Sequence, residues 1–370
     1  MNFLLSDEQL EMQATVLRAA LDGADGGARR AAFDGSDGRA DALWRTLLDL
    51  GVGGLALPET LGGMGLGMID LALAAEALGY AGVPGPFLGH AVAGLALTAA
   101  GGALASTWAP QLASGALTAT TAIVGDAQDF TPSGSRVTMT ADRVDGVVRD
   151  VVAANAADLL VVISDTAIAV VDLRAVAPAL TARDGADRTR RLFDVQLDNA
   201  PADVATFDAE RASDAIDAML VLIAADAFGG ALQCLDRSVA YAKMREQFGR
   251  PIGAFQGIKH QLADMAVDVE PARGLYWYAA YAYDNAPGER SRMASAAKAH
   301  IADVFRAASR LMTEVHGGIG YTWDCDAQIW FKRSQFDFAY FGVPARHRDR
   351  QAALAGWGGA IGAPTSSTRS

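Results

Sequence analysis

The chain has 370 residues, of which 51% are hydrophobic, and its formal net charge is −12. That length allows more than one domain with a sizeable core, and the acidic balance argues against a general nucleic-acid or anionic-membrane surface. The two cysteines, Cys234 and Cys325, have neither metal-site spacing nor the numbers for a disulfide framework. No apolar run reaches the about 20 residues of a membrane span, and the first residues lack the basic segment of a signal peptide, so we expect a cytoplasmic protein.

Apolar residues at helical spacing predict a helical bundle over residues 1–117. The first helix is expected to begin after Ser6, with acidic residues in its first turn. Residues 22–37 predict a loop with at most a short helix. The glycine-rich stretch 51–65 is typical of phosphate-binding loops, but no strand clearly precedes it and no Gly-Lys-Ser/Thr follows. The other helices expected here are 40–50, 69–80 and 85–100.

The sequence changes in character near residue 118, where β-branched runs begin. Several runs of strand type follow one another without intervening helices, which predicts a small antiparallel barrel or sandwich over residues 118–208. The expected strands are 118–124, 136–141, 159–163, 167–171 and 191–197.

Helical spacing returns after residue 208 and predicts a four-helix bundle over residues 209–358. Pro271 falls inside one of these helices, so a kink or a break is expected there. The final residues, 359–370, are expected to be disordered. The expected helices are 215–244, 258–285, 292–315 and 326–341. The order of helices, strands and helices indicates an α+β fold.

The most distinctive stretch runs from Arg245 to Gln256 and predicts a sharp corner between two helices. Gly249 tolerates a left-handed backbone, and Pro251 suits the start of a new turn. Arg245 and Phe248 are three residues apart and would share one helical face. A guanidinium beside an aromatic ring suits a ligand with a phosphate and a flat ring system. The alternative is an ordinary helix corner with a surface arginine.

Several stretches resemble motifs of the acyl-CoA dehydrogenase family in order and spacing. They are Leu57-Pro58-Glu59 with Gly62-Gly63, Glu76 to Gly79, the corner from Arg245 to Gln256, His260 to Met265, Ala297-Lys298-Ala299, and His316 to Trp323. The resemblance implies an acyl-CoA dehydrogenase-like fold, FAD as cofactor and an acyl-CoA thioester as substrate. It also implies loss of a Cα proton to a carboxylate base and of a Cβ hydride to the flavin, which leaves a trans-2-enoyl thioester.

The resemblance further implies a cofactor half-site that one subunit offers to another. Arg245 would pair with the pyrophosphate, Ile252 and Phe248 would line the adenosine or flavin edge, and the glycine turn would let the backbone approach the phosphates. Glu314 stands where the family usually has glutamine, which is unfavourable near phosphate unless the carboxylate is protonated or paired. The residues implied for cofactor binding are Arg245, Phe248, Ile252, Gln256, Glu314, Gly317 and Gly318.

The chain departs from the family at both positions that carry the catalytic base. Phe341 stands at one and Met219 at the other, and neither side chain takes up a proton. The flavin-contacting motifs are also missing at 125–132 and 151–155. The chain therefore resembles the base-less subunit of α2β2 acyl-CoA dehydrogenases that act on CoA thioesters of steroid side chains. The implied partners are a paralogous catalytic subunit and an electron-transfer acceptor.

Two alternatives stay open from the sequence. One is a self-sufficient homotetrameric dehydrogenase whose base is Asp217 or Glu210. The other is a non-redox chain that binds acyl-CoA or serves as a scaffold.

Overall fold

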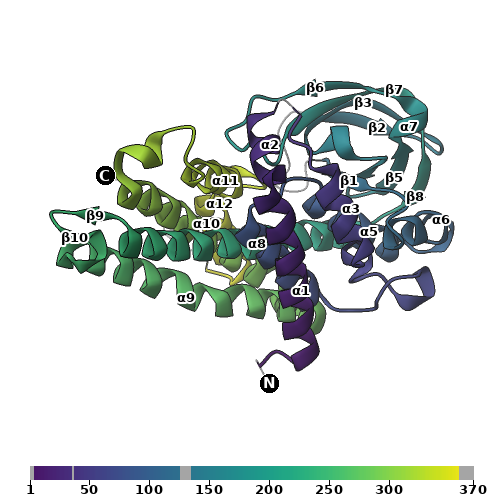
Figure 1. The fold of residues 1–370 in the computed structure, drawn as a ribbon. Helices are drawn as coiled ribbons and strands as arrows, with labels where there is room; N and C mark the ends of the chain where they lie inside the picture. Colours follow the sequence, from purple (N-terminus) through teal and green to yellow (C-terminus); the bar gives the residue numbers. More distant parts are fainter. Residues whose placement is uncertain (1–3, 36, 126–134, 358–370) are drawn as a thin grey trace, which may run out of the picture.

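The computed structural model describes residues 4–35, 37–125 and 135–357. Helices come first along the chain, two β-sheets follow, and a second set of helices completes the fold (Figure 1). This confirms the predicted α+β architecture. The segment 359–370 and most of the stretch 125–132 lie outside the described residues, and the domain boundaries at 117, 208 and 358 stay predictions.

The first helix begins where the sequence predicts. The Ser6 hydroxyl accepts a hydrogen bond from the Gln9 amide at 3.2 Å, and the Gln9 side chain accepts one from the Ser6 amide at 3.1 Å, which closes a capping box. The expected loop at 22–37 is wrong, because helix continues through a π-helical turn that contains Gly27 at φ 106°. The helices of this part are α1 (Asp7–Gly23), α2 (Arg29–Asp34), α3 (Asp41–Asp49), α4 (Met68–Ala81), α5 (Phe87–Ala100) and α6 (Gly102–Ala113).

The β region is a sandwich of two four-stranded sheets that share an apolar core. One sheet has the order β1-β4-β5-β8 and the other β2-β3-β7-β6. The predicted sandwich is confirmed, but β1 pairs with β4 in parallel, so the pairing is not wholly antiparallel. The strands are β1 (Ala119–Ile123), β2 (Arg136–Met139), β3 (Arg143–Val152), β4 (Leu159–Ile163), β5 (Ala167–Asp172), β6 (Ala179–Ala182), β7 (Leu192–Pro201) and β8 (Asp203–Thr206), with α7 (Leu173–Val176) after β5.

The second set of helices is built around α8, which runs through the centre of the molecule. Among the described residues α8 alone is long and apolar enough to cross a membrane, and 94% of its most apolar 18-residue window is buried in the protein. It is thus a core helix. The described helices here are five rather than the expected four: α8 (Ala209–Met244), α9 (Gln256–Asn285), α10 (Pro287–His316), α11 (Ala327–Ala339) and α12 (Pro344–Leu354).

A break at Pro271 is not found, because α9 continues through it as one helix. Pro271 and Val267, four residues earlier, are both exposed. The carbonyl that loses its helical donor can therefore be hydrated, which lowers the cost of the proline. The far ends of α8, α9 and α10 form an arm that points away from the β-sheets (Figure 1).

Candidate functional site

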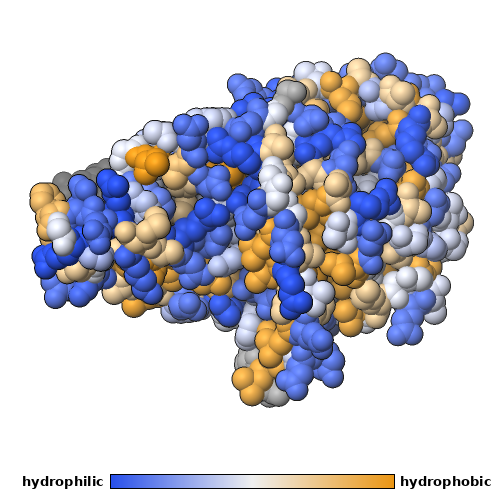
Figure 2. Space-filling view, in the orientation of Figure 1, coloured by the Kyte–Doolittle hydropathy of each residue, from blue (hydrophilic) through white to orange (hydrophobic). Residues whose placement is uncertain are grey.

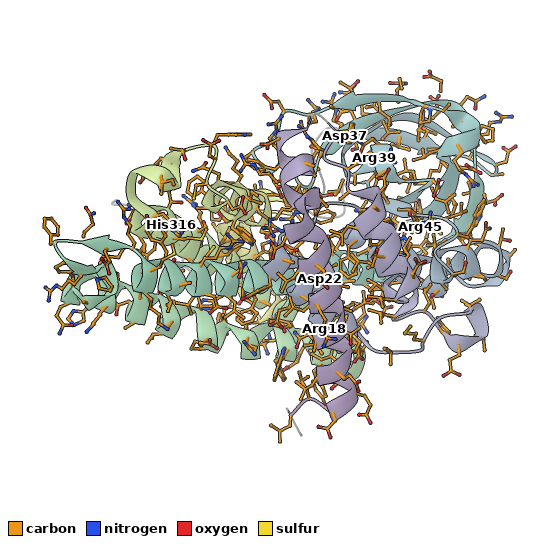
Figure 3. All side chains as sticks on the ribbon, in the orientation of Figure 1. Arg18, Asp22, Asp37, Arg39, Arg45 and His316 are labelled. Carbon is orange, nitrogen blue, oxygen red and sulfur yellow. The ribbon has the colours of Figure 1, made fainter. Side chains whose placement is uncertain are left out.

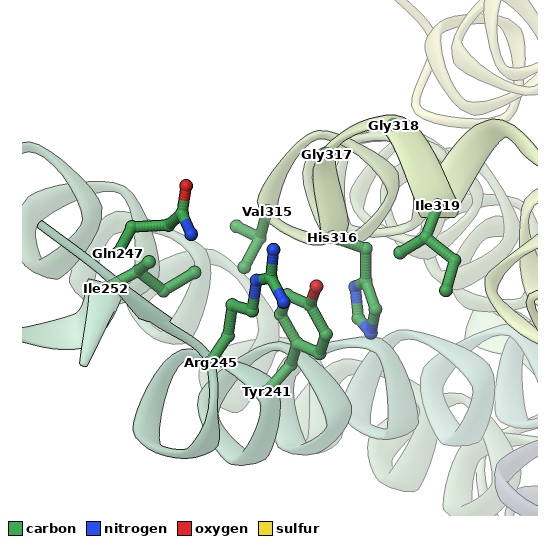
Figure 4. Close-up of a pocket in the computed structure, with 9 residues that line it drawn as sticks. All are labelled: Tyr241, Arg245, Gln247, Ile252, Val315, His316, Gly317, Gly318 and Ile319. Carbon is green, nitrogen blue, oxygen red and sulfur yellow. The ribbon is translucent and has the colours of Figure 1, made fainter. Parts of the chain in front are cut away.

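A cavity of about 500 Å³ lies between the ends of α8 and α10 (Figure 4). This volume is in the range of small-molecule and cofactor sites. His316, also labelled in Figure 3, places the cavity in the helical arm, remote from the β-sheets. The lining residues are Tyr241, Arg245, Gln247, Ile252, Val315, His316, Gly317, Gly318 and Ile319.

One side of the cavity is a two-stranded hairpin that follows α8 directly. Arg245 leaves the helix with an extended backbone, and its amide donates to the Tyr241 carbonyl at 2.8 Å. Strands β9 (Glu246–Gln247) and β10 (Arg250–Pro251) then pair in antiparallel register. The turn between them, Phe248-Gly249, has φ values of 53° and 78°. Two left-handed residues in a two-residue turn match the twist of a tight hairpin.

The expectation that Arg245 and Phe248 share a helical face is wrong. The helix ends at Met244, so Phe248 lies at the hairpin tip instead, where it is 93% exposed and does not line the cavity. Its ring meets Phe255 edge-on at 6.1 Å between centroids. In Figure 2 the end of the molecule that carries this hairpin is mainly hydrophilic, with a small apolar area at its tip.

Arg245 brings positive charge to the cavity. Within residues 4–35, 37–125 and 135–357 no ion pair or side-chain hydrogen bond engages its guanidinium. Across from it, Gly317 ends α10 at φ 65°, and a Cβ added to Gly317 or Gly318 would meet nothing within 4 Å. A guanidinium that faces a bare glycine turn is an arrangement that fits a diphosphate.

Glu314 and Gln256 do not line the cavity. Glu314 is exposed, and its carboxylate accepts a hydrogen bond from Arg310 at 2.9 Å, one helical turn earlier. The ion pair with Arg310 offsets the negative charge of Glu314, which would be unfavourable near a phosphate. Gln256 is exposed at the first turn of α9. The structure thus gathers Arg245, Ile252 and the glycine turn at one cavity, and leaves the other predicted residues outside it.

The sequence did not identify five of the lining residues, which are Tyr241, Gln247, Val315, His316 and Ile319. Tyr241 and His316 stack with 4.2 Å between ring centroids and 23° between planes. Burial lowers the pKa of His316, and Arg237 lowers it further, although the Met312 carbonyl that accepts from Nδ1 at 2.7 Å opposes this. A local signal was available for Tyr241 alone, because it lies one helical turn before Arg245, whose amide donates to its carbonyl.

Both positions at which the resemblance would place a catalytic base are buried and apolar. Met219 is 1% exposed within α8, and Phe341 is 4% exposed in the loop after α11. Phe341 has a left-handed backbone at φ 56°, and its carbonyl accepts a hydrogen bond from His347 Nε2 at 2.9 Å. The side chain packs edge-on against Tyr340 with centroids 4.9 Å apart.

The two carboxylates considered as substitute bases lie elsewhere. Asp217 is fully buried and accepts hydrogen bonds from Arg350 at 2.8 Å and from the Ser291 hydroxyl. Burial raises the pKa of Asp217, while Arg350 opposes the rise. Glu210 is exposed in the first turn of α8. Neither lines the cavity that contains Arg245.

The stretch that matches a missing flavin contact lies beside the loop of Phe341. The Tyr340 hydroxyl donates to the Asp150 carbonyl at 3.3 Å, which joins that loop to the end of β3. The residues that follow Asp150, from Val151 to Ala154, are buried. This hydrogen bond thus joins the stretch at the missing flavin contact to the loop at one expected base position.

Comparison with known proteins identifies the family to which the fold belongs. The profile described as "Acyl-CoA dehydrogenase, N-terminal domain" matches residues 6–116, and "Acyl-CoA dehydrogenase, C-terminal domain" matches residues 209–354. The acyl-CoA dehydrogenase IpdE2 of Mycolicibacterium smegmatis is 31% identical over 92% of this chain and 96% of its own. The acyl-CoA dehydrogenase FadE34 of Mycobacterium tuberculosis is 35% identical over 95% of this chain but only 48% of its own.

Among solved structures, a variant of the Tcur3481-Tcur3483 steroid ACAD superposes with a TM-score of 0.84 at 27% identity, over 95% of this chain and 98% of that chain. Two family profiles together cover more than half of the chain, and a relative above 30% identity spans nearly all of it. The chain therefore belongs to the acyl-CoA dehydrogenase family, a family of FAD-dependent oxidoreductases.

Proposed function

We propose that this chain is the base-less subunit of a heteromeric FAD-dependent acyl-CoA dehydrogenase. The observation that carries the proposal is a contrast between two sites. The cavity with Arg245 and its glycine turn is formed and open, whereas the two base positions hold the buried side chains of Met219 and Phe341. The chain would offer a nucleotide half-site while it lacks its own means of removing a Cα proton.

The cavity residues would contact different parts of FAD. Arg245 would pair with the pyrophosphate, Ile252 would line the adenosine, and Gly317 and Gly318 would let the backbone approach the phosphate oxygens. Phe248, exposed at the hairpin tip, would reach the partner's side of the cofactor. Bound FAD supplies the hydride acceptor for the Cβ hydrogen of the acyl thioester.

Because the chain would lack a base and the family's flavin-ring motifs, we infer that a partner subunit provides them. A paralogous subunit would contribute the base, the hydrogen bonds to the thioester carbonyl and the pocket for the flavin ring. The match to FadE34 covers only 48% of that relative, so about half of its length lies outside the matched region. FadE34 is therefore long enough to contain a second unit of the size of this chain. Such a length is consistent with pairing between two units of this kind.

The substrate class that we propose is an acyl-CoA thioester with a steroid-derived or comparably bulky acyl group, oxidised to its trans-2-enoyl thioester. A similar solved structure is described as a steroid ACAD with two named components. Transfer of electrons to a separate acceptor protein and a cytoplasmic location complete the proposal.

Flavin content per chain tests the proposal. The chain would be co-expressed with a paralogous acyl-CoA dehydrogenase subunit from the same genome, and the purified complex assayed for flavin and for turnover on a panel of acyl-CoA thioesters. We expect about half a flavin per chain, a 2:2 complex and no turnover by this chain alone. One flavin per chain, or robust turnover by the homomer, would refute the proposal. Loss of that turnover on Asp217→Asn or Glu210→Gln would then assign the homomer its base.

A further inference from the structure

The cavity is assembled from two elements that are far apart in sequence. Arg245 follows the end of α8, and the glycine turn follows the end of α10. The separation between these two helix ends therefore sets the distance from the guanidinium to the turn. Any ligand that bridges them requires that distance to be held.

Two aromatic rings meet at this junction. Tyr241 lies in the last turn of α8, His316 is the last residue of α10, and their rings stack at 4.2 Å with 23° between planes. Figure 4 shows both rings at the base of the cavity between the two helices. Stacked rings resist both approach and separation, because they are in van der Waals contact over their faces.

The His316 ring is held by its own helix, and the Tyr241 backbone lies where the chain leaves the other helix. The His316 Nδ1–H donates to the Met312 carbonyl of α10 at 2.7 Å, which fixes the direction of the imidazole. The Tyr241 carbonyl accepts from the Arg245 amide at 2.8 Å, at the point where the chain leaves α8. The Arg245 side chain and the Tyr241 ring both line the cavity, as Figure 4 shows. The stack thus joins the helix end from which Arg245 leaves to the helix end from which the glycine turn leaves.

We propose that Tyr241 and His316 are positioning residues, whose stacked rings hold Arg245 and the Gly317-Gly318 turn at the separation that a nucleotide diphosphate bridges. The inference rests on the proposed function for the class of ligand. It extends that function by assigning a structural role to Tyr241 and His316, which need not contact the phosphates. The face of the stack carries no formal charge, so it does not compete with the ligand for Arg245.

The test uses the full chain and ADP as the probe, with binding measured by isothermal titration calorimetry. Tyr241→Leu removes the ring, Tyr241→Phe keeps it, and Tyr278→Leu makes the same change on α9, away from the cavity. We expect Tyr241→Leu to weaken ADP binding about tenfold. We expect Tyr241→Phe and Tyr278→Leu to stay within about twofold of the wild type.

A second measurement separates positioning from simple contact. Hydrogen exchange of the amides in the 3₁₀ turn Gly317–Tyr321 should quicken in Tyr241→Leu without ligand, because the turn loses its support from α8. Thermal melts would confirm that the variants are folded.

Three results would overturn the inference. Equal ADP affinity in Tyr241→Leu and the wild type, with affinity lost in Arg245→Ala, would refute the role of the stack and leave the half-site intact. An equal loss in Tyr241→Phe would assign the effect to the hydroxyl group. Absence of ADP binding by the wild-type chain would overturn the half-site and the positioning role together.

Discussion

At the residue scale, Arg245 is the side chain on which the proposed half-site most depends. Arg245→Ala should reduce flavin retention by the co-expressed complex about 10- to 100-fold, because a charge-assisted hydrogen bond contributes about 1.5–3 kcal/mol. Arg245→Lys should recover part of the loss, since an ammonium keeps the charge without the planar fork. Arg250→Ala is the matched control, because Arg250 lies on the same hairpin but stacks over Phe255 at 4.2 Å outside the cavity. Flavin per complex after dialysis measures the effect, and similar losses in both variants would contradict it.

Phe341 gives a second prediction at this scale. Phe341→Glu places a carboxyl group at the position of the missing base, but the site is 4% exposed and apolar. We expect no gain of dehydrogenase activity and a loss of stability of roughly 2–4 kcal/mol, because a buried polar group without a partner is costly. Tyr321→Glu, at a residue that is 69% exposed, should leave stability nearly unchanged. Denaturant unfolding measures both, and turnover by Phe341→Glu would show that only the base was missing.

The sequence anticipated part of the site at this scale, and the limits have physical causes. Arg245 could be suspected from its residue type, a guanidinium near an aromatic ring, whereas Gly317 and Gly318 were expected only from the resemblance to the family. Phe248 was placed on the wrong element, because the spacing of three residues predicts a shared helical face only where the helix continues. Tyr241 and His316 were missed as a pair, since stacking between two helix ends depends on tertiary packing that no local pattern encodes.

Among the secondary-structure elements, the end of α11 and the loop that follows it are held by hydrogen bonds from a buried lysine. Lys298 is fully buried, and its ammonium donates to the carbonyls of Asp337 and Phe338 in the last turn of α11 and of Gly342 in the loop that follows. Such a lysine acts as a C-terminal cap for the helix. The sequence predicted helix over 326–341 but could not predict the cap, because Lys298 lies on α10 and reaches α11 only in the folded chain.

The same element makes stability depend on pH. Burial raises the pKa of Asp337 to about 8, and nearby Asp226 adds to the rise against the pull of Arg190. A carboxyl that holds its proton more tightly when folded favours the folded state at low pH, and this advantage is lost as pH rises from about 4 to about 8. The slope approaches about 1.4 kcal/mol per pH unit for one proton. Asp337→Asn, which stays neutral, should flatten the fall in unfolding free energy between pH 5 and about 8, measured by urea unfolding. An unchanged slope would assign the pH dependence to other groups.

At the scale of the whole molecule, a buried ionic network joins the β region to the helices. Arg190, in the connection before β7, is 2% exposed and contacts Asp187 at 3.0 Å, Asp226 of α8 at 3.2 Å and Asp337 of α11 at 2.8 Å. Its guanidinium also lies 4.2 Å from the Phe336 ring centroid. The sequence predicted the order of helices and strands, because periodicity is local. It could not predict this junction, whose members are separated by up to 150 residues, from Asp187 to Asp337.

This network should make the β region and the helices unfold together. Arg190→Met leaves three buried carboxyl groups without their shared guanidinium, and breaking a buried ion pair such as that between Arg190 and Asp226 costs about 3–5 kcal/mol. The double variant Arg190→Met/Asp337→Leu also removes one of the carboxyl groups that Arg190 contacts, so its loss should be smaller than the sum of the two single losses. Arg174→Met is the control, because Arg174 pairs with Asp172 on the surface of the same region at 2.7 Å.

Calorimetry should give one transition for the wild type and for the control. For Arg190→Met it should give two resolved transitions, or a van't Hoff enthalpy below the calorimetric enthalpy. A single cooperative transition at the wild-type temperature in Arg190→Met would mean that apolar packing alone couples the two regions.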